Sequence, residues 1–169
     1  FLSQGKIILE EVVIQNEKLA VFNRSSVNTV RCITFNTKDG VVAPFTFMKA
    51  GRSGYFVDNG SAGGILISVD PETGILGMAT DENGYRYSEH PDSKVQFCGY
   101  QLPEWKKMIN ICCEMSSQLP EVRIIGWDMA YTDKGWIVIE GNSMTESIGP
   151  QSTTLRGIRR TIEELRANI

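Results

Sequence analysis

The stretch that decides the fold is GWDMAYTDKGWIVIEGNSM, residues 126–144. Its middle, residues 132–136, suits a three-residue hairpin loop in which Gly135 supplies the left-handed conformation of a type I turn followed by a bulge. The runs on both sides of this loop therefore predict two antiparallel strands. This register pairs Thr132 with Trp136.

Three polar residues interrupt the strand pair at positions where a buried strand would carry apolar ones. Carrying the register back from the loop sets Asp128 opposite Glu140 and Gly126 opposite Asn142. All four lie on one face, because side chains alternate between the two faces of a strand. The other face collects apolar side chains and is expected to be the core: Trp127, Met129, Tyr131, Ile137 and Ile139.

The facing carboxylates of Asp128 and Glu140 need a positive charge between them. With Cβ atoms about 5 Å apart across a strand pair, two carboxylates repel each other and destabilise the sheet. A divalent cation meets this need. Asp, Glu and the amide oxygen of Asn142 are hard oxygen donors, the kind that magnesium takes together with water and nucleotide phosphates. The alternative is an Asp and a Glu on a solvated sheet face, paired with Arg or Lys.

Composition excludes several classes of protein. The 169 residues, 41% hydrophobic and 22% charged, predict a single soluble globular domain spanning 1–169. A net charge of -3 with scattered Lys and Arg speaks against nucleic-acid binding. No apolar stretch approaches the roughly 20 residues of a membrane span, and no signal peptide is evident, so we expect a cytoplasmic protein. Nothing in the sequence indicates an oligomeric state.

Cysteine and histidine usage argues against a zinc site. The only neighbouring cysteines, Cys112 and Cys113, are adjacent in sequence and fit neither a disulfide framework nor a CxxC motif, so we expect reduced, packed thiols. Because His90 is the only histidine, a zinc site with several His ligands is excluded. We expect His90 to be a packed or turn histidine.

The remaining pattern predicts an α+β fold, with a mostly antiparallel sheet and two or more flanking helices. Short runs rich in β-branched residues indicate strands at 6–14, 29–35, 41–48 and 64–69. Apolar residues at helical spacing predict a helix over 104–119. A final amphipathic helix is expected over 155–169, capped by Ser152 or Thr153.

Several blocks of sequence together resemble one family. They resemble the sugar-transfer-associated ATP-grasp family, a branch similar to the α-L-glutamate ligases. In order, the blocks are EEVVIQ, SSVNTVRCITF, VDNGSAGGI, HPDSK, QLPEW, GWDMA and VIEGN. In ATP-grasp domains, an Asp on one strand and a Glu-x-Asn on the next hold the magnesium ions that bridge the ATP phosphates. The resemblance assigns these roles to Asp128, Glu140 and Asn142, with Mn²⁺ as a possible substitute for Mg²⁺.

The same resemblance implies further nucleotide contacts. Residues 9–12 look like the hinge strand that contacts adenine, which makes Glu10, Glu11 and Val12 candidates; surface charge is the alternative for the two glutamates. Arg31 corresponds to an arginine that faces the phosphates, and its planar fork of donors suits phosphate oxygens. Arg52 and Asn59 resemble a phosphate-contacting segment of the glutamate ligases. A glycine-rich hairpin loop without a ligand is the alternative there.

By resemblance, the chain is the hinge and carboxy-terminal lobe of an ATP-grasp domain. The amino-terminal lobe is absent, so we expect weak ATP binding by this chain alone. The expected activity is that of an ATP- and Mg²⁺-dependent ligase that joins a small-molecule carboxylate to an amine or similar nucleophile through an acyl phosphate, in sugar or surface-polysaccharide metabolism. The alternatives are a non-catalytic binding or assembly module, and a transferase of the same pathway.

Overall fold

The computed structural model of the chain describes residues 11–53 and 63–168. The described part contains a seven-stranded antiparallel sheet in the order β5-β4-β3-β2-β1-β6-β7. Its strands are β1 (Thr29–Thr37), β2 (Gly40–Ala50), β3 (Ile65–Val69), β4 (Leu76–Thr80), β5 (Arg86–Tyr87), β6 (Ile124–Thr132) and β7 (Gly135–Asn142). The helices are α1 (Glu17–Ala20), α2 (Trp105–Ser117), α3 (Ile148–Thr154) and α4 (Arg159–Ala167). The predicted α+β class is confirmed.

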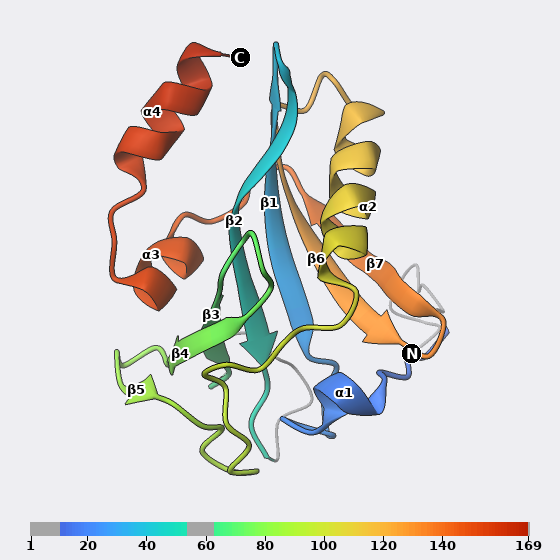
Figure 1. Cartoon of the computed structure of the whole chain (residues 1–169), viewed down its shortest axis with the longest axis vertical. Helices are drawn as coiled ribbons and strands as arrows, with labels where there is room; N and C mark the ends of the chain where they lie inside the picture. Colours follow the sequence, from blue (N-terminus) through green and yellow to red (C-terminus); the bar gives the residue numbers. More distant parts are fainter. Residues whose placement is uncertain (1–10, 54–62, 169) are drawn as a thin grey trace, which may run out of the picture.

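Helices cover the sheet from both sides: α2 lies against one face, and α3 and α4 lie against the other (Figure 1). The side of α2 that faces the sheet has a buried residue every three or four positions, as the sequence predicts: Trp105, Met108, Cys112 and Ser116. On the opposite face, Ile162 and Leu165 of α4 pack against a smaller apolar cluster that includes Ile33 and Phe35. The face under α3 and α4 is the one that carries Asp128.

The end of α2 is tied to β1 by a buried amide. Asn36 is 7% exposed, and its Nδ2 donates to the carbonyl oxygens of Ser116, Leu119 and Val122 at 3.1, 3.1 and 2.8 Å. The carbonyls of Ser116 and Leu119 also accept from the backbone amides of Leu119 and Val122, so Asn36 reinforces a turn that has its own hydrogen bonds and joins it to β1.

Two hairpins use the same four-residue turn. Thr37 pairs with Gly40 in TKDG, and Thr132 pairs with Gly135 in TDKG. Gly40 and Gly135 have φ angles of 121° and 100°, which a side chain disfavours. The predicted three-residue loop after Thr132 is therefore wrong: the loop has two residues, and Tyr131 rather than Thr132 pairs with Trp136.

A bulge in β7 restores the register further from the turn. Met129 pairs with Val138 but Asp128 pairs with Glu140, so Ile139 has no partner on β6. The predicted pairs Asp128–Glu140 and Gly126–Asn142 are confirmed.

The shorter loop, which pairs Trp136 with Tyr131, and the bulge at Ile139 together change the predicted core. The expectation that Ile137 and Ile139 are core residues is wrong, since Ile137 is half-buried and Ile139 is 42% exposed. Trp136 takes the core position instead, with its ring centroid 5.0 Å from that of Tyr131.

The first predicted strand and the last predicted helix both need correction. The described residues 11–14 of the expected strand 6–14 form no strand, and only Gln15 bridges to Thr132. The expected final helix over 155–169 lies at Arg159–Ala167 as α4, and the sequence did not predict α3 before it, which ends where Leu155 adopts a left-handed conformation with φ 55°. Ser152 and Thr153 therefore lie inside α3 instead of capping α4.

Candidate active site

The sheet register places three charged side chains in one row across β1, β6 and β7. Arg31 pairs directly with Asp128, and Asp128 pairs directly with Glu140. Directly paired residues have Cβ atoms about 5 Å apart, so all three side chains can interact. Asn142 stands opposite Gly126, two residues along the same face. The fold thus brings together Arg31 and the three predicted metal ligands.

Asp128 is held by two cations. Asp128 is 2% exposed. Arg31 binds its carboxylate through two nitrogens of the guanidinium group: Nε lies 2.5 Å from Oδ1 and Nη2 lies 2.7 Å from Oδ2. Lys49 adds a third bond, with Nζ 3.0 Å from Oδ2. Charge-assisted bonds of this kind are short and strong. The repulsion between the two carboxylates is therefore relieved by cationic side chains of the chain itself.

These pairs set the ionisation of the site. Burial alone would raise the pKa of Asp128, but the hydrogen bond from Arg31 and the charge of Lys49 outweigh it and hold this pKa below its usual range. Burial likewise opposes the charge on Arg31, yet its bond to Asp128 raises the Arg31 pKa. Asp128 is thus an anion and Arg31 a cation throughout the physiological range.

Lys49 is the site residue that the sequence reasoning missed. It pairs with Thr29, two residues along from the pair Phe47–Arg31, so it lies on the same face as Arg31. Only 9% of Lys49 is exposed. The available signal was a lone lysine near the end of the apolar run VVAPFTFMKA, residues 41–50. A buried lysine needs a paired anion, which points to a site.

Glu140 and Asn142 are more accessible than Asp128. The side chain of Glu140 is 57% exposed, and its Oε1 lies 4.0 Å from Nη2 of Arg31. Asn142 donates from Nδ2 to Glu140 Oε1 at 2.9 Å, which leaves the Asn142 amide oxygen available. A carboxylate oxygen has two lone pairs, so Asp128 Oδ1, which accepts one bond, also keeps one. The donor set fits magnesium, which prefers such hard oxygens.

Gly126 makes room for this arrangement. A Cβ atom at Gly126 would lie 2.4 Å from Oγ1 of Thr145 and 3.2 Å from Cδ of Arg31. Thr145 itself accepts a hydrogen bond from Nη1 of Arg31 at 3.3 Å. The glycine in GWD therefore lets the chain after β7 fold back against the guanidinium group.

A cavity of about 710 Å³ borders the row at Arg31, whereas Asp128 and Glu140 do not line it. Its walls include Arg31, Lys49 and Asn142. An apolar part of the wall comes from the segment after β7, where Met144 is 92% and Ile148 65% exposed. Single chains rarely leave such large apolar side chains grouped and uncovered without a binding role.

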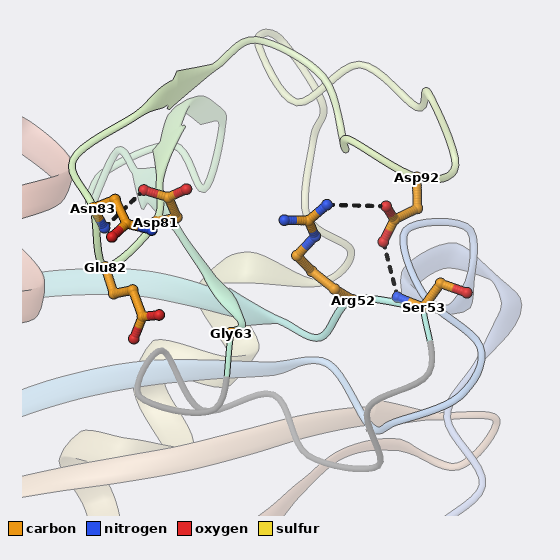
Figure 2. A pocket seen from close by; sticks show the side chains of 7 residues that line it. All are labelled: Arg52, Ser53, Gly63, Asp81, Glu82, Asn83 and Asp92. Atoms are coloured by element: carbon orange, nitrogen blue, oxygen red, sulfur yellow. Dashed lines mark hydrogen bonds and ion pairs between the residues drawn. The ribbon is translucent and has the colours of Figure 1, made fainter.

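Arg52 lies in a second, smaller cavity of about 300 Å³. Figure 2 shows the Arg52 side chain turned toward Asp92, which accepts from Arg52 Nη2 at 3.3 Å and from the backbone amide of Ser53 at 2.8 Å, with Asp81 and Glu82 across the cavity. Both cavities include Asp81 and Glu82 in their walls, but the structure does not place Arg52 beside Arg31.

His90 anchors the same segment. It is 1% exposed, and its Nδ1 accepts from the amides of Asp92 and Ser93 at 3.2 Å each. Nε2 therefore carries the proton and donates to the Gly51 carbonyl at 2.9 Å. Burial lowers the pKa of His90. The expectation of a packed or turn histidine is confirmed.

The remaining predicted residues do not join the row. Glu11 and Val12 are exposed, Val12 by 82%, and neither lines the cavity over Arg31. Glu10 and Asn59 lie outside the described residues.

The described residues contain neither a cluster of three metal-binding His, Cys, Asp or Glu side chains nor a helix that could cross a bilayer. Within 11–53 and 63–168, no three side chains drawn from His, Cys, Asp and Glu form a metal-binding group; the predicted set has two carboxylates and an amide. No helix in those ranges combines the length and the apolar character needed to cross a bilayer.

Comparison with known proteins identifies the family of the chain. Residues 3–166 match the sequence model of the family described as sugar-transfer-associated ATP-grasp. The chain belongs to the sugar-transfer-associated ATP-grasp family. No curated protein matches it in a direct sequence search. Membership of this ATP-grasp family implies an ATP-dependent activity of ligase-like or transferase type, associated with sugar transfer. ATP-grasp domains typically bind ATP and Mg²⁺.

Proposed function

We propose that this domain forms the metal- and phosphate-binding half of an ATP-dependent ligase site. The reaction joins a small-molecule carboxylate to an amine or similar nucleophile through an acyl phosphate, in sugar or surface-polysaccharide metabolism. The observation that carries the proposal is the row Arg31–Asp128–Glu140 with Lys49 beside it, next to a cavity that Arg31, Lys49 and Asn142 line.

Each residue of the row has a distinct task. Glu140 and Asn142 are the accessible oxygen donors for a magnesium ion, and Asp128 adds a carboxylate that stays ionised because Arg31 and Lys49 lower its pKa. The ion, when bound, neutralises phosphate charge. Arg31 and Lys49 supply N–H donors for phosphate oxygens, and Arg31 stabilises the phosphoryl group in transfer. The row includes no nucleophilic side chain, which suits a reaction between two substrates.

The cavity matches a nucleotide in its division of polarity. Its wall carries the cations Arg31 and Lys49 beside the carboxylates of Asp81, Glu82 and Glu146, whereas Met144, Ile148 and Leu155 line it with exposed apolar side chains. A nucleotide has the same two parts, a polyphosphate and a flat, largely apolar base. Ligand sites generally combine an apolar lining with a few well-placed polar groups.

Substitution of the carboxylates tests the proposal. In the complete protein, Asp128→Asn and Glu140→Gln each remove one negative ligand with little change of shape, and each should abolish ATP turnover. Glu121→Gln is the matched control, since Glu121 is exposed and outside the cavity. Near-normal ATP hydrolysis or ligation by either site variant would overturn the metal assignment.

A further inference from the structure

The charges of the row and of Lys49 balance one another, and the carboxylates of Asp81, Glu82 and Glu146 line the adjoining cavity as well. Asp128 and Glu140 carry two negative charges, and Arg31 and Lys49 carry two positive charges. Lys49 reaches across from β2 to share Oδ2 of Asp128 with Arg31, at 3.0 and 2.7 Å. The carboxylate that is predicted to bind metal is thus already neutralised by cations that are predicted to bind phosphate.

We propose that Lys49 is a positioning residue that makes metal binding depend on an anion. This inference rests on the proposed function. Lys49 occupies Asp128 while the cavity holds no phosphate, and it turns to a phosphate oxygen when one is present. Asp128 Oδ2 then becomes available to the metal. Lys49 thereby keeps the site from filling with a metal ion alone.

Electrostatics gives the reason for this dependence. A metal ion that binds alone at Asp128 places a double positive charge next to Lys49 and Arg31 and competes with them for their shared carboxylate. An anion that binds alone meets Asp128 and Glu140. When the metal ion and the anion both bind, the metal ion contacts the Asp128 carboxylate and the anion contacts Lys49, so each ligand favours the binding of the other. The low exposure of Lys49 and Asp128 makes the unpaired alternatives costly.

Lys49 suits this exchange better than Arg31 does. Arg31 is fixed by two bonds to Asp128 and one to Thr145, and it lies 4.0 Å from Glu140. Lys49 has one bond to Asp128, on a flexible stem with a compact ammonium group. It can leave Asp128 by rotation about its own side-chain bonds, without movement of the sheet.

The test measures binding of Mn²⁺ alone, by electron paramagnetic resonance of the free ion. Lys49→Met removes the charge and keeps the stem. We expect it to bind Mn²⁺ at least about tenfold more tightly than the wild type, within the usual range of coupling between sites. The same variant should bind tripolyphosphate alone more weakly than the wild type. Lys49→Arg should restore wild-type Mn²⁺ binding, and Lys106→Met, on the exposed surface, should change neither affinity.

A double-mutant cycle shows whether the effect passes through Asp128. In an Asp128→Asn background, Lys49→Met should no longer strengthen Mn²⁺ binding. An unchanged or weaker Mn²⁺ affinity in Lys49→Met, including no detectable binding, overturns the proposal, as does a gain that persists without Asp128. If Lys49→Met does not fold, as judged by circular dichroism, Lys49→Gln takes its place. Loss of turnover in Asp128→Asn together with an unchanged Mn²⁺ affinity in Lys49→Met would refute this inference alone.

Discussion

Replacement of Asp128 by Asn should destabilise the fold as well as the site. The substitution removes the anion shared by Arg31 and Lys49, whose side chains are only 13% and 11% exposed. Asn offers one acceptor oxygen in place of two, and it carries no charge. Two cations then stay beside each other without their counterion.

The size of the effect follows from the burial of the pair. Removing one partner of a buried ion pair typically costs about 3–5 kcal/mol. Arg31 and Lys49 border the cavity of about 710 Å³, so water can reach them and reduce that cost. We therefore expect the free energy of unfolding to fall by about 2–3 kcal/mol, between the values for exposed and fully buried pairs.

Glu140→Gln is the matched control. Glu140 also faces the site, but its side chain is 57% exposed and lies 4.0 Å from Arg31, so its removal should change stability by less than about 1 kcal/mol. Urea unfolding followed by tryptophan fluorescence measures both variants at pH 7. Because the folded-state pKa of Asp128 is lowered, its contribution is present at neutral pH and is lost as the pH falls below the ordinary value of 3.8. Equal stability of Asp128→Asn and wild type, or equal loss in both variants, would refute the account of the ion pairs.

Two further predictions concern residues away from the row. The folded-state pKa of His90 is lowered, so its contribution to stability is complete above the ordinary value of 6.5. Below that pH the unfolded chain takes up the proton first, and the free energy of unfolding falls. The free energy of unfolding of His90→Gln should lack this slope between pH 7 and pH 5. Asn36→Ala removes the buried amide that joins the end of α2 and the turn after it to β1, and should lower the free energy of unfolding by about 2 kcal/mol in urea titrations, whereas no loss would show that water replaces the amide.

Local patterns were enough to predict most elements of the fold. The turn residues of TKDG and TDKG, the spacing of apolar residues in α2 and the short β-branched runs each act over a few residues, so they can be recognised without the tertiary structure. The pair Asp128–Glu140 was predicted correctly although the loop beside it was not. The loop is one residue shorter than expected and the bulge at Ile139 adds one residue, so the two errors cancel.

Features set by distant contacts could not be predicted. Arg31 and Lys49 meet Asp128 across 97 and 79 residues of sequence, and only the strand order brings them together. The break between α3 and α4 has the same origin. Leu155 is left-handed although leucine favours helices, because the chain must turn there for Ile162 to pack against the sheet.

The position of the metal tests the central claim most directly. Crystals of the complete protein grown with Mn²⁺ and a non-hydrolysable ATP analogue would locate the ion by its anomalous scattering. The account predicts a peak at coordination distance from Glu140, Asn142 and Asp128, with Lys49 turned to a phosphate oxygen. A nucleotide-bound structure with Mn²⁺ elsewhere, and Lys49 still on Asp128, would contradict it.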